Sequence, residues 1–196
     1  YAVLKPQLVA AQVTNVYETI ERPLIPVLVA MEREGIKVDE KVLRALSKDF
    51  EKRMAAFELT AHKLAGREFA LASPKQLGEV LFDEMGIPGG KRGKSGQYAT
   101  GAGVLDDLAA QGHDLPQVIL DWRQIAKLKS TYTDALIAQI NPKTGRVHTS
   151  YSMAATSTGR LASSDPNLQN IPVRSEEGRK IRAAFVAEKG NVLLSV

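Results

Sequence analysis

Apolar residues recur at helical spacing along most of the chain. In residues 15–35, "NVYETIERPLIPVLVAMEREG", this spacing predicts a helix, and Pro23 and Pro26 predict two helical pieces that meet at a kink. A longer periodic run follows, for which Asp39 is the predicted N-cap and Gly66 the predicted stop. The first third of the chain is therefore expected to be helical.

Further helix signals occur along the middle of the chain. Ser73 followed by Pro74 predicts the start of a third helix that ends at Gly86. Thr100 is expected to cap a short helix, and residues 116–138 are expected to form another long one.

The last third has a different pattern. "NPKTG" at 141–145 predicts a turn, and "RVHTSYS" at 146–152 alternates like a strand. Residues 183–196, "AAFVAEKGNVLLSV", predict a hairpin whose second strand, 192–196, is apolar enough to be buried on both faces. Such a strand needs neighbours on both sides, so we expect the sequence to be a piece of a larger protein. The predicted fold class is α+β, mostly α.

Composition and charge narrow the classes of protein to which the chain could belong. The 196 residues are 44% hydrophobic and only 6% aromatic, which favours helices, and the absence of cysteine excludes disulfides and thiolate metal sites and favours a reducing cytoplasm. No apolar run approaches the length of a membrane span. The net charge is +4, and residues 120–182 hold ten Lys and Arg against five Asp and Glu. This distribution suggests a polyanionic partner.

One face of the helix predicted at 116–138 is polar. On a helical wheel, Arg123, Lys127, Ser130, Thr131 and Asp134 lie opposite the apolar side chains. A solvated face is one interpretation. The other is a stripe of cations and hydroxyls that binds phosphates. The pattern alone leaves both open.

Candidate chemistry is scarce elsewhere. His62, His113 and His148 have no ligand-type spacing, and no nucleotide-binding or nucleophile fingerprint occurs, so no metal site is expected in this span. The polar stretch 155–174, "ATSTGRLASSDPNLQNIPVR", fits neither a helix nor a strand. Its side chains must contact a partner or one another, the latter through Asx and Ser turns.

Several segments carry a resemblance to a known family. "TGRLASSDPNLQNIPVR" (158–174) and "EEGRKIRAAF" (176–185) closely resemble the start of the palm in family A DNA polymerases, of the bacterial DNA polymerase I type. "KLKSTYTDAL" (127–136) and "INPKTGRVHTSY" (140–151) are similar to the preceding thumb-to-palm segment, and "PLIPVLVAMEREGIKVD" (23–39) to the start of the thumb. The loop 88–103 matches only in being basic and small, and Ser157 and Ala162 depart from the usual residues.

The resemblance implies an architecture. Residues 1–20 would be the tail of an exonuclease-like domain, 21–140 an elongated thumb of long antiparallel helices with a small tip, and 141–196 the start of the palm with its first antiparallel strands. The last strand would run on into Asp-Tyr-Ser-Gln-Ile-Glu, whose Asp is the first catalytic carboxylate. The parent would be a DNA-directed DNA polymerase that uses Mg²⁺ held outside this span, and we expect the chain alone to be inactive, with no catalytic residue of its own.

The resemblance also implies roles for single residues. The thumb would grip the DNA backbone through Arg123, Lys127, Lys129, Ser130 and Thr131, with Lys91, Arg92 and Lys94 at its tip. Arg160, Asn167, Gln169 and Asn170 would line the minor groove at the primer terminus, and Arg174 would lie near the incoming dNTP. The implied partners are primer–template double-stranded DNA and dNTP, for a monomer in the bacterial cytoplasm. Alternatives are a free-standing helical DNA-binding module and a protein-interaction domain without nucleic acid.

Overall fold

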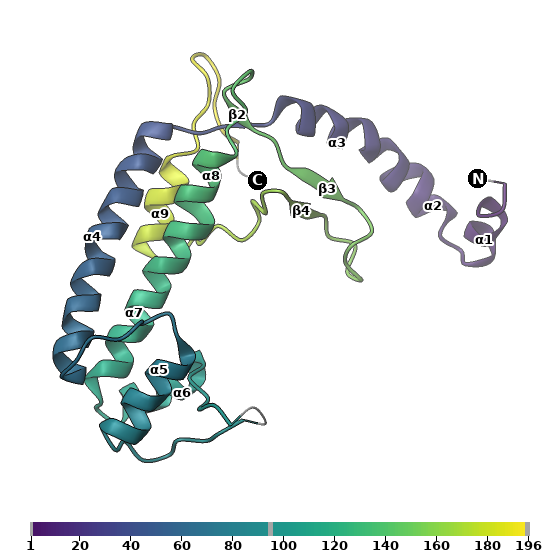
Figure 1. Ribbon diagram of the computed structural model, residues 1–196. Helices are drawn as coiled ribbons and strands as arrows, with labels where there is room; N and C mark the ends of the chain where they lie inside the picture. Colours follow the sequence, from purple (N-terminus) through teal and green to yellow (C-terminus); the bar gives the residue numbers. More distant parts are fainter. Residues whose placement is uncertain (1, 94–95, 195–196) are drawn as a thin grey trace. The chain divides into compact units, whose positions relative to one another are not determined.

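The computed structural model describes residues 2–93 and 96–194, and their fold is mostly helical with small two-stranded antiparallel sheets (Figure 1). The α-helices are α1 (Lys5–Ala10), α2 (Thr14–Val16), α3 (Arg22–Glu34), α4 (Glu40–Ala65), α5 (Pro74–Gly78), α6 (Ala102–Ala110), α7 (Asp114–Leu128), α8 (Ala135–Ala138) and α9 (Glu176–Ala183). Three π-helical segments are η1 (Tyr17–Glu21), η2 (Glu79–Glu84) and η3 (Lys129–Asp134). The strands are β1 (Ile36–Lys37), β2 (Arg146–Val147), β3 (Ser150–Ser152) and β4 (Ala162–Ser164).

The chain divides into two compact units. The first unit comprises residues 1–43 and 135–196, and the second comprises residues 44–134. The predicted mostly helical fold with antiparallel strands is confirmed at this level.

The second unit has a continuous apolar core. Side chains from α5, η2, α6 and α7 contribute most of it, and its buried members are Ala61, Phe69, Leu71, Leu77, Val80, Leu81, Ile87, Leu105, Leu108, Leu115 and Ile119. The helices that supply these residues begin and end largely where the sequence predicts. The Ser73 side chain accepts a hydrogen bond from the Gln76 N–H at 3.4 Å, as expected of the cap before Pro74.

The long helix α4 also begins and ends as predicted. The Asp39 carboxylate accepts hydrogen bonds from the N–H groups of Lys41 at 2.9 Å and Val42 at 3.2 Å. The helix ends at Ala65, and Gly66 follows with a positive φ of 74°.

The predicted strand at 146–152 is two strands with different partners. β2 pairs with β1, so that Val147 lies opposite Ile36, and β3 pairs with β4. Between them, Thr149 is buried and its hydroxyl donates to the carbonyls of Ser164 at 3.0 Å and Pro166 at 2.8 Å. The alternating pattern predicted strand geometry but not this change of partner.

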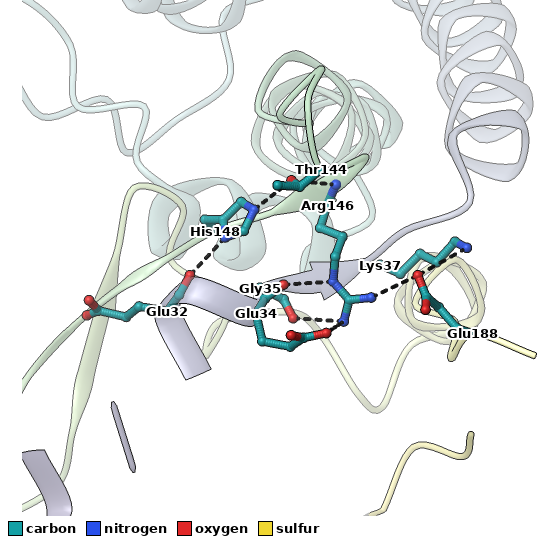
Figure 2. A network of polar contacts seen from close by, with 8 residues as sticks. All are labelled: Glu32, Glu34, Gly35, Lys37, Thr144, Arg146, His148 and Glu188. Carbon is teal, nitrogen blue, oxygen red and sulfur yellow. Dashed lines mark hydrogen bonds and ion pairs between the residues drawn. The ribbon is translucent and has the colours of Figure 1, made fainter. Parts of the chain in front are cut away.

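The C-terminal end of α3 is held by two side chains from the segment around β2 (Figure 2). The Arg146 guanidinium donates to the carbonyls of Glu34 at 2.7 Å and Gly35 at 3.2 Å. His148 bonds through Nδ1 to the carbonyl of Glu32 at 2.8 Å, so this nitrogen carries the proton. These carbonyls have no partner within the helix, and the two side chains satisfy them.

Arg146 is also the centre of an ion-pair network. Its side chain is 18% exposed and forms ion pairs of 3.3 Å with the carboxylates of Glu34 and Glu188. Glu188 also pairs with Lys37 at 3.7 Å. The network therefore ties the corner between α3 and β1 to β2 and to the turn around Glu188 (Figure 2).

Three predictions about local structure are wrong. Residues 191–194 form no strand, and Val192 and Leu194 are 84% and 85% exposed, because no described strand lies beside them to bond their backbone; residues 195 and 196 lie outside the described part. Gly101, not Thr100, is the N-cap of α6. α3 runs through Pro26, so only Pro23 coincides with a change of helix, at the junction of η1 and α3.

Gly35 should be the most sensitive position in this corner. Its φ of 65° and ψ of −171° lie in a region that only glycine populates, and an added Cβ would meet the Val147 carbonyl oxygen at 2.6 Å. Gly145 has a similar φ of 67° but open space around it. We expect Gly145→Ala to cost about 1–2 kcal/mol for the left-handed backbone, and Gly35→Ala at least about 1 kcal/mol more for the clash.

Denaturant unfolding of the two variants, followed by circular dichroism, measures this difference. Equal losses of unfolding free energy in the two variants would show that the contact with Val147 does not constrain Gly35.

Candidate nucleic-acid interface

In the first unit, the polar stretch 155–174 is held mainly by its own bonds. The Gln169 side-chain amide donates to the Leu161 carbonyl at 2.8 Å and accepts from the Ser163 N–H at 3.2 Å. The Asn167 side-chain oxygen accepts from the Gln169 N–H at 3.0 Å. These are the Asx-type and side-chain-to-backbone bonds that the sequence offered as one of two interpretations of this stretch.

The two arginines of this stretch have a different environment. Arg160 and Arg174 are exposed, and neither guanidinium forms a hydrogen bond or ion pair with a described residue. The backbone at Arg160 nevertheless has a local contact, because its carbonyl accepts a bond from the Thr156 hydroxyl at 2.8 Å. Asn170 is exposed and has a bonding partner in the chain. The stretch therefore combines an internally bonded frame with two available cations.

In the second unit, the polar stripe predicted on one helix spans α7 and η3. Lys127 is exposed, and its ammonium group has no partner among the described side chains or carbonyls. Ser130 and Thr131 are also exposed, and the Ser130 hydroxyl lies 3.4 Å from the Lys127 carbonyl oxygen. The structure thus brings one available cation and two hydroxyls together on adjacent turns.

Arg123, the other cation of the stripe, has a partner within the chain, and so has Lys129, which the family resemblance adds to the stripe. Arg123 is partly buried, and one of its terminal nitrogens donates to the Thr100 carbonyl at 2.6 Å. Burial lowers the pKa of the Arg123 guanidinium. Lys129 is paired with Asp134, with Nζ 2.8 Å from a carboxylate oxygen. Neither occupation could be read from the helical wheel.

In the basic loop between η2 and α6, the cation Arg92 also has partners within the chain. The Arg92 guanidinium lies 4.2 Å from the centre of the Tyr98 ring, donates to the Tyr98 hydroxyl at 3.0 Å and lies 3.5 Å from the Asp83 carboxylate. The Tyr98 hydroxyl donates to Asp83 at 2.5 Å. The hydrogen bond that Arg92 donates to Tyr98 and the nearby charges raise the pKa of Arg92. Lys91 is exposed without such contacts, and Lys94 lies outside the described residues.

The described residues do not fit a magnesium site. No three His, Asp or Glu side chains in the part of the chain that the structure describes lie close enough together to hold a metal ion. No step is therefore assigned to a metal within this span. None of the helices that the structure describes is long and apolar enough to cross a membrane.

Comparisons with known proteins agree with one another. Residues 40–196 match the model of the family "DNA polymerase family A". The chain is 57% identical over 195 residues to the DNA polymerase I of Rhizobium leguminosarum, covering 100% of the chain and 19% of that protein. It is 49% identical over 181 residues to the thermostable DNA polymerase I of Thermus aquaticus, covering 92% of the chain and 22% of the relative.

A solved structure is similar as well. The structure titled "POL domain of Pol1 from M. smegmatis complex with DNA primer-template and dNTP" aligns with a TM-score of 0.86 and 38% identity, over 95% of this chain and 33% of that one. The chain spans about a fifth of the length of these curated relatives. On the family match and these identities, the chain belongs to DNA polymerase family A.

Proposed function

We propose that this chain is the thumb and the start of the palm of a bacterial DNA polymerase I, and that it holds primer–template DNA for template-directed nucleotidyl transfer. The observation that carries the proposal is the likeness, at a TM-score of 0.86, to a polymerase domain whose title names DNA primer-template and dNTP. The parent would act as a monomer in the bacterial cytoplasm, during replication and repair, with Mg²⁺ held by residues outside this span.

The available cations support this proposal. Lys91, Lys127, Arg160 and Arg174 are exposed and have no acceptor among the described residues. Phosphate contacts from lysine and arginine supply most of the affinity of a protein that binds DNA without sequence preference. Lys91 and Lys127 would contact backbone phosphates, and Ser130 and Thr131 would add neutral hydrogen bonds. Arg174 would contact the triphosphate of the incoming dNTP.

The internally bonded amides fit a supporting role. Gln169 and Asn167 hold the backbone from Leu161 to Gln169. A frame of this kind restricts the segment that carries Arg160, so that the guanidinium can reach a base edge at low entropic cost. Asn167, Gln169 and Asn170 would therefore line the minor groove chiefly by shaping the loop beside Arg160.

The minor groove suits an enzyme that must accept every correct pair. Purine N3 and pyrimidine O2 are acceptors there in A·T and T·A alike, and G·C pairs retain them. A donor such as the Arg160 guanidinium can then bond to any correctly shaped terminal pair. A mispair displaces the acceptor and leaves the cation unmatched, at a cost of about 1–3 kcal/mol.

The chain by itself should not extend a primer. By the family resemblance, the catalytic carboxylates lie beyond residue 196, and the described residues hold no cluster of acids for a metal. Primer extension by the pure 196-residue chain, above that of a mock preparation, would contradict this expectation.

The phosphate contacts predict a change in salt dependence. In the full-length polymerase, Lys127→Ala and Lys91→Ala should each lower the log–log slope of affinity against salt by roughly 0.9, because each removes one neutralised phosphate. Ser130→Ala should weaken binding without changing the slope. Fluorescence anisotropy with labelled primer–template over a salt series measures both quantities.

Lys52→Ala is the matched control for this experiment, because Lys52 is an exposed lysine of α4 outside the proposed contacts. The proposed phosphate-binding residues Lys91, Lys127, Ser130 and Thr131 form the DNA grip. If Lys127→Ala and Lys91→Ala behave like Lys52→Ala, the two lysines belong to a solvated face and not to the DNA grip.

The role of Arg160 predicts a loss of discrimination. Arg160→Ala in the full-length polymerase should slow the extension of matched primer termini more than that of mismatched ones. Replacing N3 of the terminal primer purine with C–H should slow the wild type strongly and the variant little, as a double-mutant cycle requires of a direct contact. Single-turnover extension measures these rates, and purely additive losses would mean that Arg160 does not contact that atom.

A further inference from the structure

We propose that Asp134 is a positioning residue of the DNA grip: it pairs with Lys129 and withholds this lysine from the phosphates, so that Lys127 carries the charge of this segment. The inference rests on the proposed function. It assigns opposite roles to two lysines that are separated by one residue and that the family resemblance places together in the grip.

The Asp134 carboxylate is bonded through both of its oxygens. One oxygen lies 2.8 Å from Lys129 Nζ, and the other accepts a hydrogen bond from the Ser47 hydroxyl at 2.5 Å. The Thr133 hydroxyl lies 3.4 Å from this second oxygen and donates to the Lys129 carbonyl at 2.9 Å. Both oxygens of Asp134 are thus occupied, and the carboxylate is held from two segments of the second unit.

The helical register of η3 brings Lys129 and Asp134 together. Lys129 and Asp134 are the first and last residues of η3, a π-helical segment. Residues five apart in an α-helix point about 140° away from each other. In a π-helix the backbone bond joins residues five apart, which brings them to the same side. The wider turn therefore makes the pair possible.

The surroundings of Asp134 also favour its charged form. Partial burial raises the pKa of Asp134, but the hydrogen bonds from Lys129 and Ser47 and the charge of Lys129 outweigh it, so the net pKa lies below the ordinary value. Asp134 is therefore ionised at neutral pH, and the pair has no net charge. A phosphate that approached Lys129 would also approach this carboxylate, whose like charge opposes it.

Lys127 differs from Lys129 in both exposure and pairing. The Lys129 side chain is only 23% exposed and is paired, whereas Lys127 is exposed and unpaired within the described chain. Counterion release depends on phosphates neutralised by the protein, so a lysine that is already neutralised contributes little to it. Removing Asp134 should therefore add a phosphate contact rather than remove one.

The test measures the salt dependence of primer–template binding by the full-length polymerase and five variants, two of which are controls. Lys129→Ala should leave the slope unchanged. Asp134→Asn, which keeps the shape and an acceptor for Ser47, should make the slope steeper by roughly 0.9. Adding Lys129→Ala to Asp134→Asn should restore the wild-type slope. Between about 50 and 200 mM salt, a slope change of 0.9 corresponds to a change in affinity of about 3.5-fold.

Two controls separate the possible outcomes. Ser47→Ala removes a structural bond to Asp134 but no charge, so it should leave the slope unchanged. Lys127→Ala tests the proposed function itself. An unaltered slope in this variant would contradict the proposed DNA grip and not the role of Asp134. If Lys129→Ala flattens the slope as much as Lys127→Ala does, or if Asp134→Asn leaves it unchanged, Asp134 does not withhold Lys129.

Discussion

The acceptor to which a cationic side chain bonds decides what that cation can do in this chain. Arg146 bonds to carbonyls and carboxylates within the first unit and caps the end of α3. Arg92 and Lys129 form ion pairs with carboxylates of the second unit. Lys127 and Arg160 have no acceptor for their side chains among the described residues. Because a bonded cation in a partly buried site is costly to displace, this pairing marks Arg146 and Lys129, whose side chains are 18% and 23% exposed, as structural cations.

Much of the helical framework could be predicted from the sequence, because its signals are local. Asp39 caps α4, and Ser73 with Pro74 begins α5, by bonds that span only a few residues. The failures concern longer range. Thr100 resembles a cap, yet its carbonyl serves as the acceptor for Arg123, 23 residues away. The strand pattern at 146–152 could not reveal that its two halves pair with different strands.

The sequence named candidate DNA-binding residues, but it could not predict which of them bond to other residues of the chain. A helical wheel assumes an α-helical register throughout, and η3 departs from it, so the pairing of Lys129 with Asp134 could not be foreseen. The sequence left two interpretations of the Asn167 and Gln169 amides open, namely contact with a partner or bonds within the stretch. The structure supplies the internal bonds for both side chains, while their contribution to DNA binding stays a prediction.

The availability of individual lysines can be measured directly. Amine acetylation of the full-length polymerase, with and without primer–template DNA and resolved by mass spectrometry, reports the exposure of each ammonium group. Lys127 and Lys91 should react readily in the absence of DNA and be protected in its presence. Lys129 should react slowly in both cases, because its ammonium is paired with Asp134 and its side chain is 23% exposed. Protection of Lys129 by DNA, with Lys127 unaffected, would contradict the division between paired and available cations.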